Sequence, residues 1–333
     1  MHGGRFLTVR KSFAMLRGIT MNKRKVCMIT ALLFTSITCL GWVGCKNTPH
    51  VHSWKSEYTC DFHSHWLQCE GCDEKKDLSS HTISSNSCEV CGYLFTPTEG
   101  IVYTLSNDGT QAAVLEYNGT AKNVVIAASY EGVPVTKVMD YAFADNRELT
   151  SVVLPDSILT VGKNVFSGCT ALTNVFIPSS TTAIGADVFL DCNSLEELVV
   201  PFIGASIENE ENSHIGYWFG GSTPDEHPTC VPSTLKKVTI TKAHFLGDYA
   251  FRYCANLTDV TIPRSVTQIG YGAFYQCKQL KSIFIPNTVS LVKNYAFAYC
   301  YDITIYCEAE SQPQIWDPNW NYGFPVVWDS KAP

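Results

Sequence analysis

A unit of 23 residues recurs along most of this chain, and this period restricts the fold more than any other feature. Three residue types keep the period, with a single interruption between Phe189 and Phe251. They are phenylalanine (Phe143, Phe166, Phe189, Phe251, Phe274 and Phe297), proline (Pro155, Pro178, Pro201, Pro263 and Pro286) and cysteine (Cys169, Cys192, Cys254, Cys277 and Cys300). A repeat of this length indicates a solenoid, in which each unit covers the apolar surface of its neighbour.

Each repeat also contains a short apolar run that ends in proline, such as Leu172, Val175 and Ile177 before Pro178. This spacing predicts a short strand with inward-pointing Val and Ile side chains, stacked in parallel on its neighbours about 4.8 Å away. Proline ends the strand because it has no N–H for the next ladder bond. We therefore predict an α/β-type solenoid of leucine-rich repeats, rich in β-strand, with a parallel β-sheet on its concave face and a cap at each end.

The order of residues from Ile262 to Cys277 resembles the BspA-like leucine-rich repeat family of bacterial and protist surface proteins. The resemblance covers about residues 138–307, and the segments before and after these repeats also resemble parts of family members. It implies a leucine-rich repeat fold and a location at the cell surface. It implies no particular ligand, because family members are variously regarded as adhesins or as binders of host proteins and other cells.

The segments that flank the repeats are expected to cover the ends of the solenoid. Residues 97–137 form the predicted N-terminal cap, a hairpin around Asp108 and Gly109 followed by a first degenerate repeat. The leucine-rich repeats follow at residues 138–307, with an insertion at residues 202–233. Residues 308–333, with Trp316, Trp320 and Trp328, are the predicted C-terminal cap. Such caps hide the apolar surface and sheet edge of an open end.

The amino terminus reads as an export signal that starts at Met21. Residues 1–20 are interpreted as an upstream extension that is not native, and residues 21–44 as a signal peptide with a basic start and an apolar core. Gly44 before Cys45 resembles the lipobox of bacterial lipoproteins, which implies a lipid on Cys45 that anchors the chain to a membrane. Cleavage by an ordinary signal peptidase and an uncleaved anchor are the alternatives. All three place the remainder outside the cytoplasm, at the cell surface or secreted.

Residues 46–96 form a separate module that is rich in cysteine and histidine. Cys69 and Cys72 are followed after fifteen residues by Cys88 and Cys91, which is the spacing of a zinc ribbon. Four thiolates would complete the shell of a structural zinc ion and leave no open position for catalysis. A module with so few large apolar residues needs a metal or disulfides for stability, so disulfide pairing is the alternative. His65 and His81 are either substitute ligands or neighbours that pack near the site.

Two groups of residues are candidates for partner binding. One is the row of outward-pointing residues on the concave strands, namely Val153, Phe176, Val199, Thr239, Thr261 and Phe284. The other is the aromatic run Tyr217, Trp218 and Phe219 in the insertion, because insertions in solenoids emerge as loops and often carry recognition. Exposed aromatic residues on a concave face suggest a binding surface. The alternative is that such residues only favour strands.

Composition narrows the function further. The net charge of -7 and the lack of a basic stripe argue against a nucleic-acid partner. The sequence contains no recognisable nucleophile elbow, metalloprotease motif or phosphate loop, so we expect a protein that is not an enzyme. The favoured hypothesis is a surface-anchored protein that binds a protein or glycan partner on host or neighbouring cells. A passive spacer of the cell envelope and a hydrolase of wall or host material are the alternatives.

Overall fold

The computed structural model describes residues 53–60, 64–70, 75–80, 83–84, 87–88, 90–208 and 210–332. The predicted extension, signal peptide and lipidation site at Cys45 lie outside the described residues. None of the helices in the described ranges is long and apolar enough to cross a membrane.

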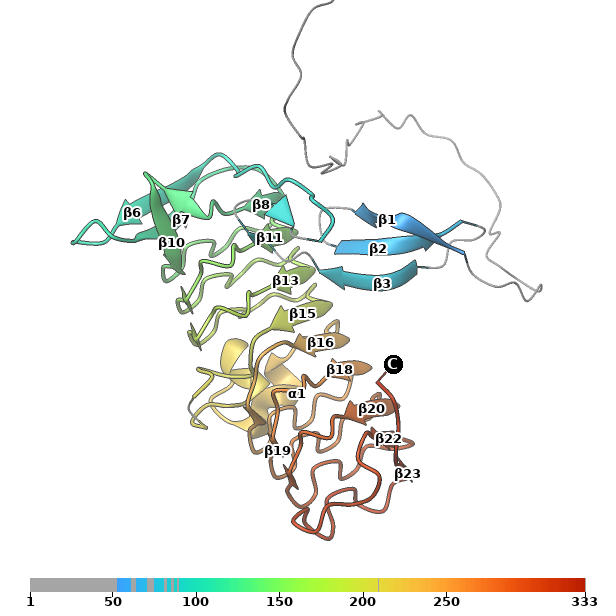
Figure 1. Cartoon of the computed structure of the whole chain (residues 1–333). Helices are drawn as coiled ribbons and strands as arrows, with labels where there is room; N and C mark the ends of the chain where they lie inside the picture. The colour runs from blue at the N-terminus through green and yellow to red at the C-terminus, as the bar shows by residue number, and fades with distance from the viewer. Residues whose placement is uncertain are drawn as a thin grey trace, which may run out of the picture.

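The repeats form a solenoid whose parallel strands stack one above another along one side (Figure 1). We call this side the concave sheet. Its first six strands, in spatial order, are β8 (Asn123–Val125), β11 (Ser151–Val153), β13 (Asn174–Phe176), β15 (Glu197–Val200), β16 (Lys237–Ile240) and β18 (Asp259–Thr261). Three more follow: β20 (Ser282–Ile285), β22 (Thr304–Cys307) and β23 (Val326–Val327). The predicted solenoid with a parallel sheet is therefore confirmed.

A second side of each coil carries two-residue strands and joins the N-terminal hairpin. The strands β12 (Thr160–Val161) and β14 (Ala183–Ile184) continue a sheet that begins with β6 (Ile101–Leu105), β7 (Ala112–Tyr117) and β10 (Val133–Val138). The short β9 (Ser129–Tyr130) pairs with β10. Further along lie β17 (Phe245–Leu246), β19 (Gln268–Ile269) and β21 (Leu291–Val292). Helix is scarce in the described residues because turns, rather than helices, close these coils.

The third side of each coil is a turn that carries the repeated phenylalanine into the core. Backbone bonds also link these turns along the stack, as from Phe274 N–H to the Ala296 carbonyl at 2.7 Å. Phe274 lies between Phe251 and Phe297 with ring centroids 5.3 and 5.1 Å away, and all three rings are fully buried. This continuous aromatic column explains why the phenylalanine keeps its period so strictly.

The column extends one coil beyond the period identified in the sequence. Trp320 follows Phe297 by 23 residues and packs edge-on against it, with ring centroids 5.9 Å apart. Trp316 lies 4.8 Å from Trp320, and Trp328 lies 6.0 Å from Trp316. These three indoles cover the last coil.

The cysteine column stabilises the same turns. The thiols of Cys169, Cys192, Cys277 and Cys300 each donate to the phenylalanine carbonyl of the preceding coil, at 2.8 to 3.2 Å. Burial raises the pKa of Cys169 to about 12. These cysteines are therefore compact, hydrogen-bonded core residues.

The Cys/His module contains an antiparallel sheet of β1 (Trp54–Cys60), β2 (Ser64–Cys69) and β3 (Lys75–Ser80). A small hairpin of β4 (Ile83–Ser84) and β5 (Ser87–Cys88) follows. Trp66 and Cys69 are buried.

Candidate functional site

The predicted outward residues of the concave sheet lie in one row. Val153 pairs with Phe176, and Val199, Thr239 and Thr261 follow in register on successive strands. On the next sheet, Phe284 pairs with Tyr306, which pairs with Val327. We call this set the concave row. Tyr306 and Val327 were not among the predicted residues.

The N-terminal end of the concave row is covered. Phe95 packs on Val125 and Val153, and Val153 is only 9% exposed. Thr98 holds the segment that carries Phe95 against strand β8. Its N–H donates to the Val125 carbonyl at 2.9 Å, and its hydroxyl accepts from Val125 N–H. Val199 is buried as well. Val153 and Val199 therefore do not face solvent, which corrects the expectation that the whole row is accessible.

Phe176 and Thr239 are half-buried, and the most accessible part of the row lies at its C-terminal end. Thr261 is exposed, Phe284 is half-buried, and Tyr306 and Val327 are 39% and 43% exposed. Beside them Arg264 forms a two-pronged ion pair with Glu308, with Nη1 and Oε2 2.7 Å apart. These hydrogen bonds lower the pKa of Glu308. The row thus ends in an apolar patch next to a paired charge.

The insertion forms an enlarged coil, while the strands on either side of it, β15 and β16, stay paired. It contains η1 (Ile215–Trp218), η2 (Pro224–Glu226) and α1 (His227–Cys230). Trp218 is fully buried, packs edge-on against Phe189 and donates from Nε1 to the Gly204 carbonyl at 2.9 Å. Phe219 is also buried and lies 5.8 Å from Phe189. Their proposed role in partner binding was wrong, because they cover the core of the preceding coil; Tyr217 is half-buried.

Two buried histidines fasten the insertion to the coil that follows it. His214 Nδ1 lies 3.0 Å from His227 Nε2, and His227 Nδ1 lies 2.6 Å from the Arg252 carbonyl oxygen. Because a carbonyl only accepts, His227 carries its proton on Nδ1 and accepts at Nε2, where Gly216 N–H also points. Burial lowers the pKa of His227 to about 3 and lowers that of His214. Both rings are therefore neutral at physiological pH.

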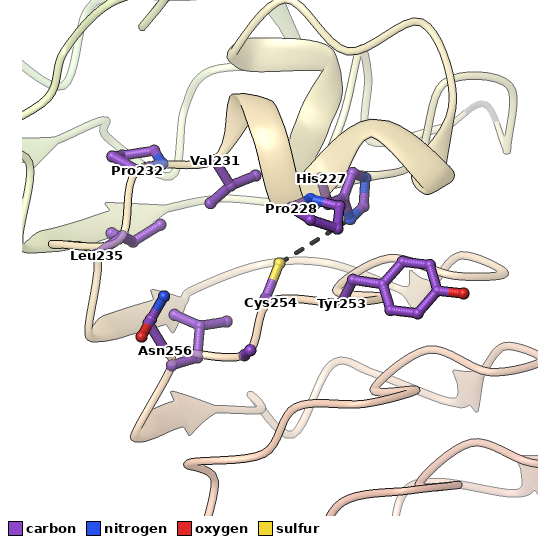
Figure 2. Close-up of a pocket in the computed structure, with 10 residues that line it drawn as sticks. His227, Pro228, Val231, Pro232, Leu235, Tyr253, Cys254 and Asn256 are labelled. Atoms are coloured by element: carbon purple, nitrogen blue, oxygen red, sulfur yellow. Dashed lines mark hydrogen bonds between the residues drawn. The ribbon is translucent and has the colours of Figure 1, made fainter.

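A small cavity of about 110 Å³ lies beside this histidine pair (Figure 2). Cys254 and His227 line it, with Sγ 3.9 Å from Nδ1. Burial raises the pKa of the Cys254 thiol, whereas burial lowers that of His227. The pair is thus held as neutral thiol and neutral imidazole, the opposite of an activated nucleophile.

Metal ligands are not gathered in the described part of the chain. No three His, Cys, Asp or Glu side chains there form a cluster suited to a metal ion. Of the predicted zinc ligands, Cys69 is buried, Cys91 is half-buried, Cys72 lies outside the described residues, and only the backbone of Cys88 is described. The zinc site therefore stays a prediction.

Comparison with known families agrees with the geometry of the repeats. Six copies of the BspA type leucine rich repeat region match residues 121–213 and 232–311, more than half of the chain. The chain belongs to the BspA-type leucine-rich repeat family. No similar protein was found among curated proteins.

Solved structures similar to this chain include leucine-rich repeat proteins from bacteria. One from T. pallidum is 26% identical, with a TM-score of 0.39, 66% of this chain covered and 83% of that one. A leucine rich cell surface protein from Faecalibacterium prausnitzii is 28% identical, with a TM-score of 0.42, 67% of this chain covered and 56% of that one. The BspA-type chain described here thus matches little more than half of the Faecalibacterium protein.

One surface of this BspA-type protein has no counterpart in our sequence predictions. Seven tyrosines gather on the turns of the last four coils, and we call them the tyrosine ladder: Tyr249, Tyr253, Tyr271, Tyr275, Tyr295, Tyr299 and Tyr322. They form two columns, one through Tyr249, Tyr271 and Tyr295 and one through Tyr253, Tyr275 and Tyr299, which meet at Tyr322. Neighbouring ring centroids within the columns are 4.9 to 6.1 Å apart.

Most ladder tyrosines occupy backbone positions that ordinarily favour other residues. Each coil except the last turns through two left-handed positions, two residues before and two residues after the buried aromatic ring; the last coil has only the second. Earlier coils place Tyr141 and Asp145, then Asn164 and Gly168, then Asp187 and Asp191, at these positions. The coils of Phe251, Phe297 and Trp320 place tyrosine there, at Tyr249, Tyr253, Tyr295, Tyr299 and Tyr322, with φ between 55° and 62°, whereas the coil of Phe274 places Gly272 and Gln276 there. Asn, Asp and Gly adopt this conformation readily, whereas other residues lose about 1–2 kcal/mol.

Proposed function

We propose that this protein acts outside the cytoplasm, held to a membrane by a lipid on Cys45, and binds a protein or glycan partner without catalysing a reaction. The observation that carries the proposal is the exposed end of the concave row, where Phe284, Tyr306 and Val327 lie side by side in register. Contiguous exposed apolar side chains in a soluble domain typically mark an interaction site.

The composition of this patch suits a binding surface. Tyr306 offers a large ring with a polar tip, and Arg264 with Glu308 supplies a charged rim next to it. Interface energy concentrates in a few such aromatic anchors. Phe95 covers Val153 at the N-terminal end of the row, so the contact excludes that end.

A non-catalytic role is consistent with the chemistry of the cavity between the insertion and the coil that follows it. The Cys254 and His227 side chains are both buried in their neutral forms, so they lack the charge state of a thiol nucleophile and its base. A passive spacer is the competing function, and it predicts no dependence on the concave row.

The test is binding of the full chain to immobilised extracellular-matrix proteins and to intact neighbouring bacteria. The variant Phe284→Ser with Tyr306→Ser removes two aromatic anchors, and we expect at least a tenfold loss of bound protein. Tyr141→Ser is the matched control, because Tyr141 is 56% exposed on the turn side of an early coil. Equal binding by parent and double variant would refute the concave site, and no binding by either would favour the spacer.

A further inference from the structure

The tyrosine ladder is not explained by the needs of the fold. Two earlier coils fill the same left-handed positions with Asn164, Gly168, Asp187 and Asp191, which adopt this backbone with less strain than tyrosine, and the first coil places a single tyrosine, Tyr141, there. The aromatic rings that complete the core belong to other residues, such as Phe274 and Phe297. A strained backbone with side chains that point outward is the kind of outlier from which a functional role is inferred.

The ladder presents ring faces, ring edges and hydroxyl groups together. Within each column most neighbouring rings are steeply inclined, by 87° between Tyr253 and Tyr275 and by 76° between Tyr271 and Tyr295. This packing leaves Tyr295, Tyr299 and Tyr322 37%, 38% and 40% exposed. Each exposed tyrosine therefore offers an apolar ring surface and a hydrogen-bonding hydroxyl at one place.

The charges next to the ladder are paired with each other. Arg252 lies over Tyr249, Tyr253 and Tyr275, with its guanidinium carbon 4.6 to 5.3 Å from the ring centroids. Its Nη1 forms an ion pair with Asp225 at 2.8 Å. Lys293 in turn lies 3.0 Å from Asp248. A ladder with compensated charges suits an uncharged ligand better than a polyanion or an acidic peptide.

We propose that the tyrosine ladder is a second binding surface, separate from the concave row, and that it takes a neutral linear glycan. The apolar C–H face of a sugar ring can stack on a tyrosine ring, and the sugar hydroxyls can form hydrogen bonds with the tyrosine hydroxyl. The ladder repeats once per coil over four coils, about 15 Å at strand spacing. The length of one sugar in a linear chain is similar to the spacing between neighbouring coils, so successive sugars meet successive tyrosines.

Two other occupants fit these observations less well. A proline-rich peptide also binds aromatic grooves, but its helix advances about 9 Å per turn, so it would use only every second coil. A second copy of this chain requires roughly 800 Å² per partner for a stable interface. The ladder is only two tyrosines wide, and four of its seven rings are already half-buried.

The experiment is a calorimetric titration of the full chain with cellohexaose, chitohexaose and laminarihexaose. Tyr295→Asn combined with Tyr299→Asn removes two of the three exposed rings but keeps residues that tolerate the left-handed backbone. We expect at least one hexasaccharide to bind, and the Kd to rise at least tenfold in the double variant. Tyr141→Asn is the matched control, since Tyr141 has φ 63° and lies outside the ladder, and its Kd should equal that of the parent.

The proposal is overturned if no hexasaccharide binds the parent, or if the double variant binds as well as the parent. It is also overturned if Tyr141→Asn loses binding equally, if decaproline binds at the ladder in place of a glycan, or if the double variant abolishes a dimer seen by light scattering. The concave variant Phe284→Ser with Tyr306→Ser should retain glycan binding. Failure of the concave site is thereby distinguished from failure of the ladder.

Discussion

His227 Nδ1 lies 2.6 Å from the carbonyl oxygen of Arg252, so a neutral imidazole joins the insertion to the coil that follows it. The second nitrogen of the same ring is engaged by His214 and Gly216. The backbone packs closely against this ring, because a Cβ added at Gly216 would lie only 2.5 Å from His227 Cδ2. The insertion is therefore a structural coil with a titratable fastening.

This fastening predicts that stability falls with pH below neutrality. The pKa of His227 is lowered to about 3, so between that value and 6.5 the unfolded chain binds a proton that the folded chain does not. Stability is complete above pH 7, and His227 should remove roughly 2 kcal/mol by pH 5. Urea unfolding at pH 7.5 and pH 5 measures this loss. His227→Gln should show a flatter dependence over the same interval, and an equal slope in both proteins would contradict the prediction.

The aromatic column predicts a large loss of stability when one ring is removed. Phe274 is fully buried between two parallel rings, inclined to it by 12° and 3°. Phe274→Ala should lower the free energy of unfolding by about 3–5 kcal/mol, because a cavity remains in the core. Phe274→Leu, which fills more of the space, should lose less. A change below about 1 kcal/mol in urea unfolding for Phe274→Ala would show that the column can collapse into the gap.

The sequence predicted the solenoid because the core of each coil repeats with the chain. Phe274 and Cys277 must meet the same neighbours in every coil, so they recur at 23 residues. The insertion was harder to interpret, because the sequence does not show that Trp218 and Phe219 pack on Phe189. Without that contact they resemble exposed aromatic residues of a loop. The prediction did not allow for the crossing of Phe95, because nothing in the repeat signals a contact from the preceding module.

The tyrosine ladder escaped detection for a different reason. Tyr249, Tyr271 and Tyr295 are separated by 22 and 24 residues, so a search at the exact period misses them. Turn side chains that point outward tolerate such one-residue shifts, whereas inward-pointing rings do not. A concentration of tyrosine in the last coils was the available signal.

Thiol reactivity follows from the cysteine column. Burial raises the pKa of Cys169 and of Cys307 to about 12, from an ordinary value of 9.0. Their thiolate fraction is thus about 1000-fold smaller than that of a free thiol at the same pH. With iodoacetamide at pH 8, peptide mapping should find these cysteines unmodified in the folded chain and modified in urea. The half-buried Cys230 should react first among the repeat cysteines, and rapid labelling of Cys169 would contradict its burial.

Metal content and intact mass distinguish the predicted zinc site from the disulfide alternative. The full chain, purified under reducing conditions, should bind about one zinc ion, because four thiolates form a closed tetrahedral site. Cys69→Ser with Cys72→Ser should abolish zinc binding, measured by elemental analysis. Cys230→Ser, in the insertion, is the matched control and should retain the metal. If the native chain instead binds no zinc and its intact mass is lower by two hydrogen atoms per cysteine pair, the module is held by disulfides.

The ladder positions predict that asparagine and alanine behave differently at Tyr299. Its φ of 59° costs a tyrosine about 1–2 kcal/mol, and asparagine less. The ring of Tyr299 lies 5.1 Å from that of Tyr275 and 4.9 Å from that of Tyr322, and each of these contacts contributes about 0.5–1.5 kcal/mol to stability. Tyr299→Asn relieves strain while losing these contacts, so its free energy of unfolding should stay within about 1 kcal/mol of the parent. Tyr299→Ala keeps the strain, loses the contacts and should be less stable than Tyr299→Asn in urea unfolding. The reverse order would mean that backbone strain does not govern these positions, and that packing alone selects tyrosine there.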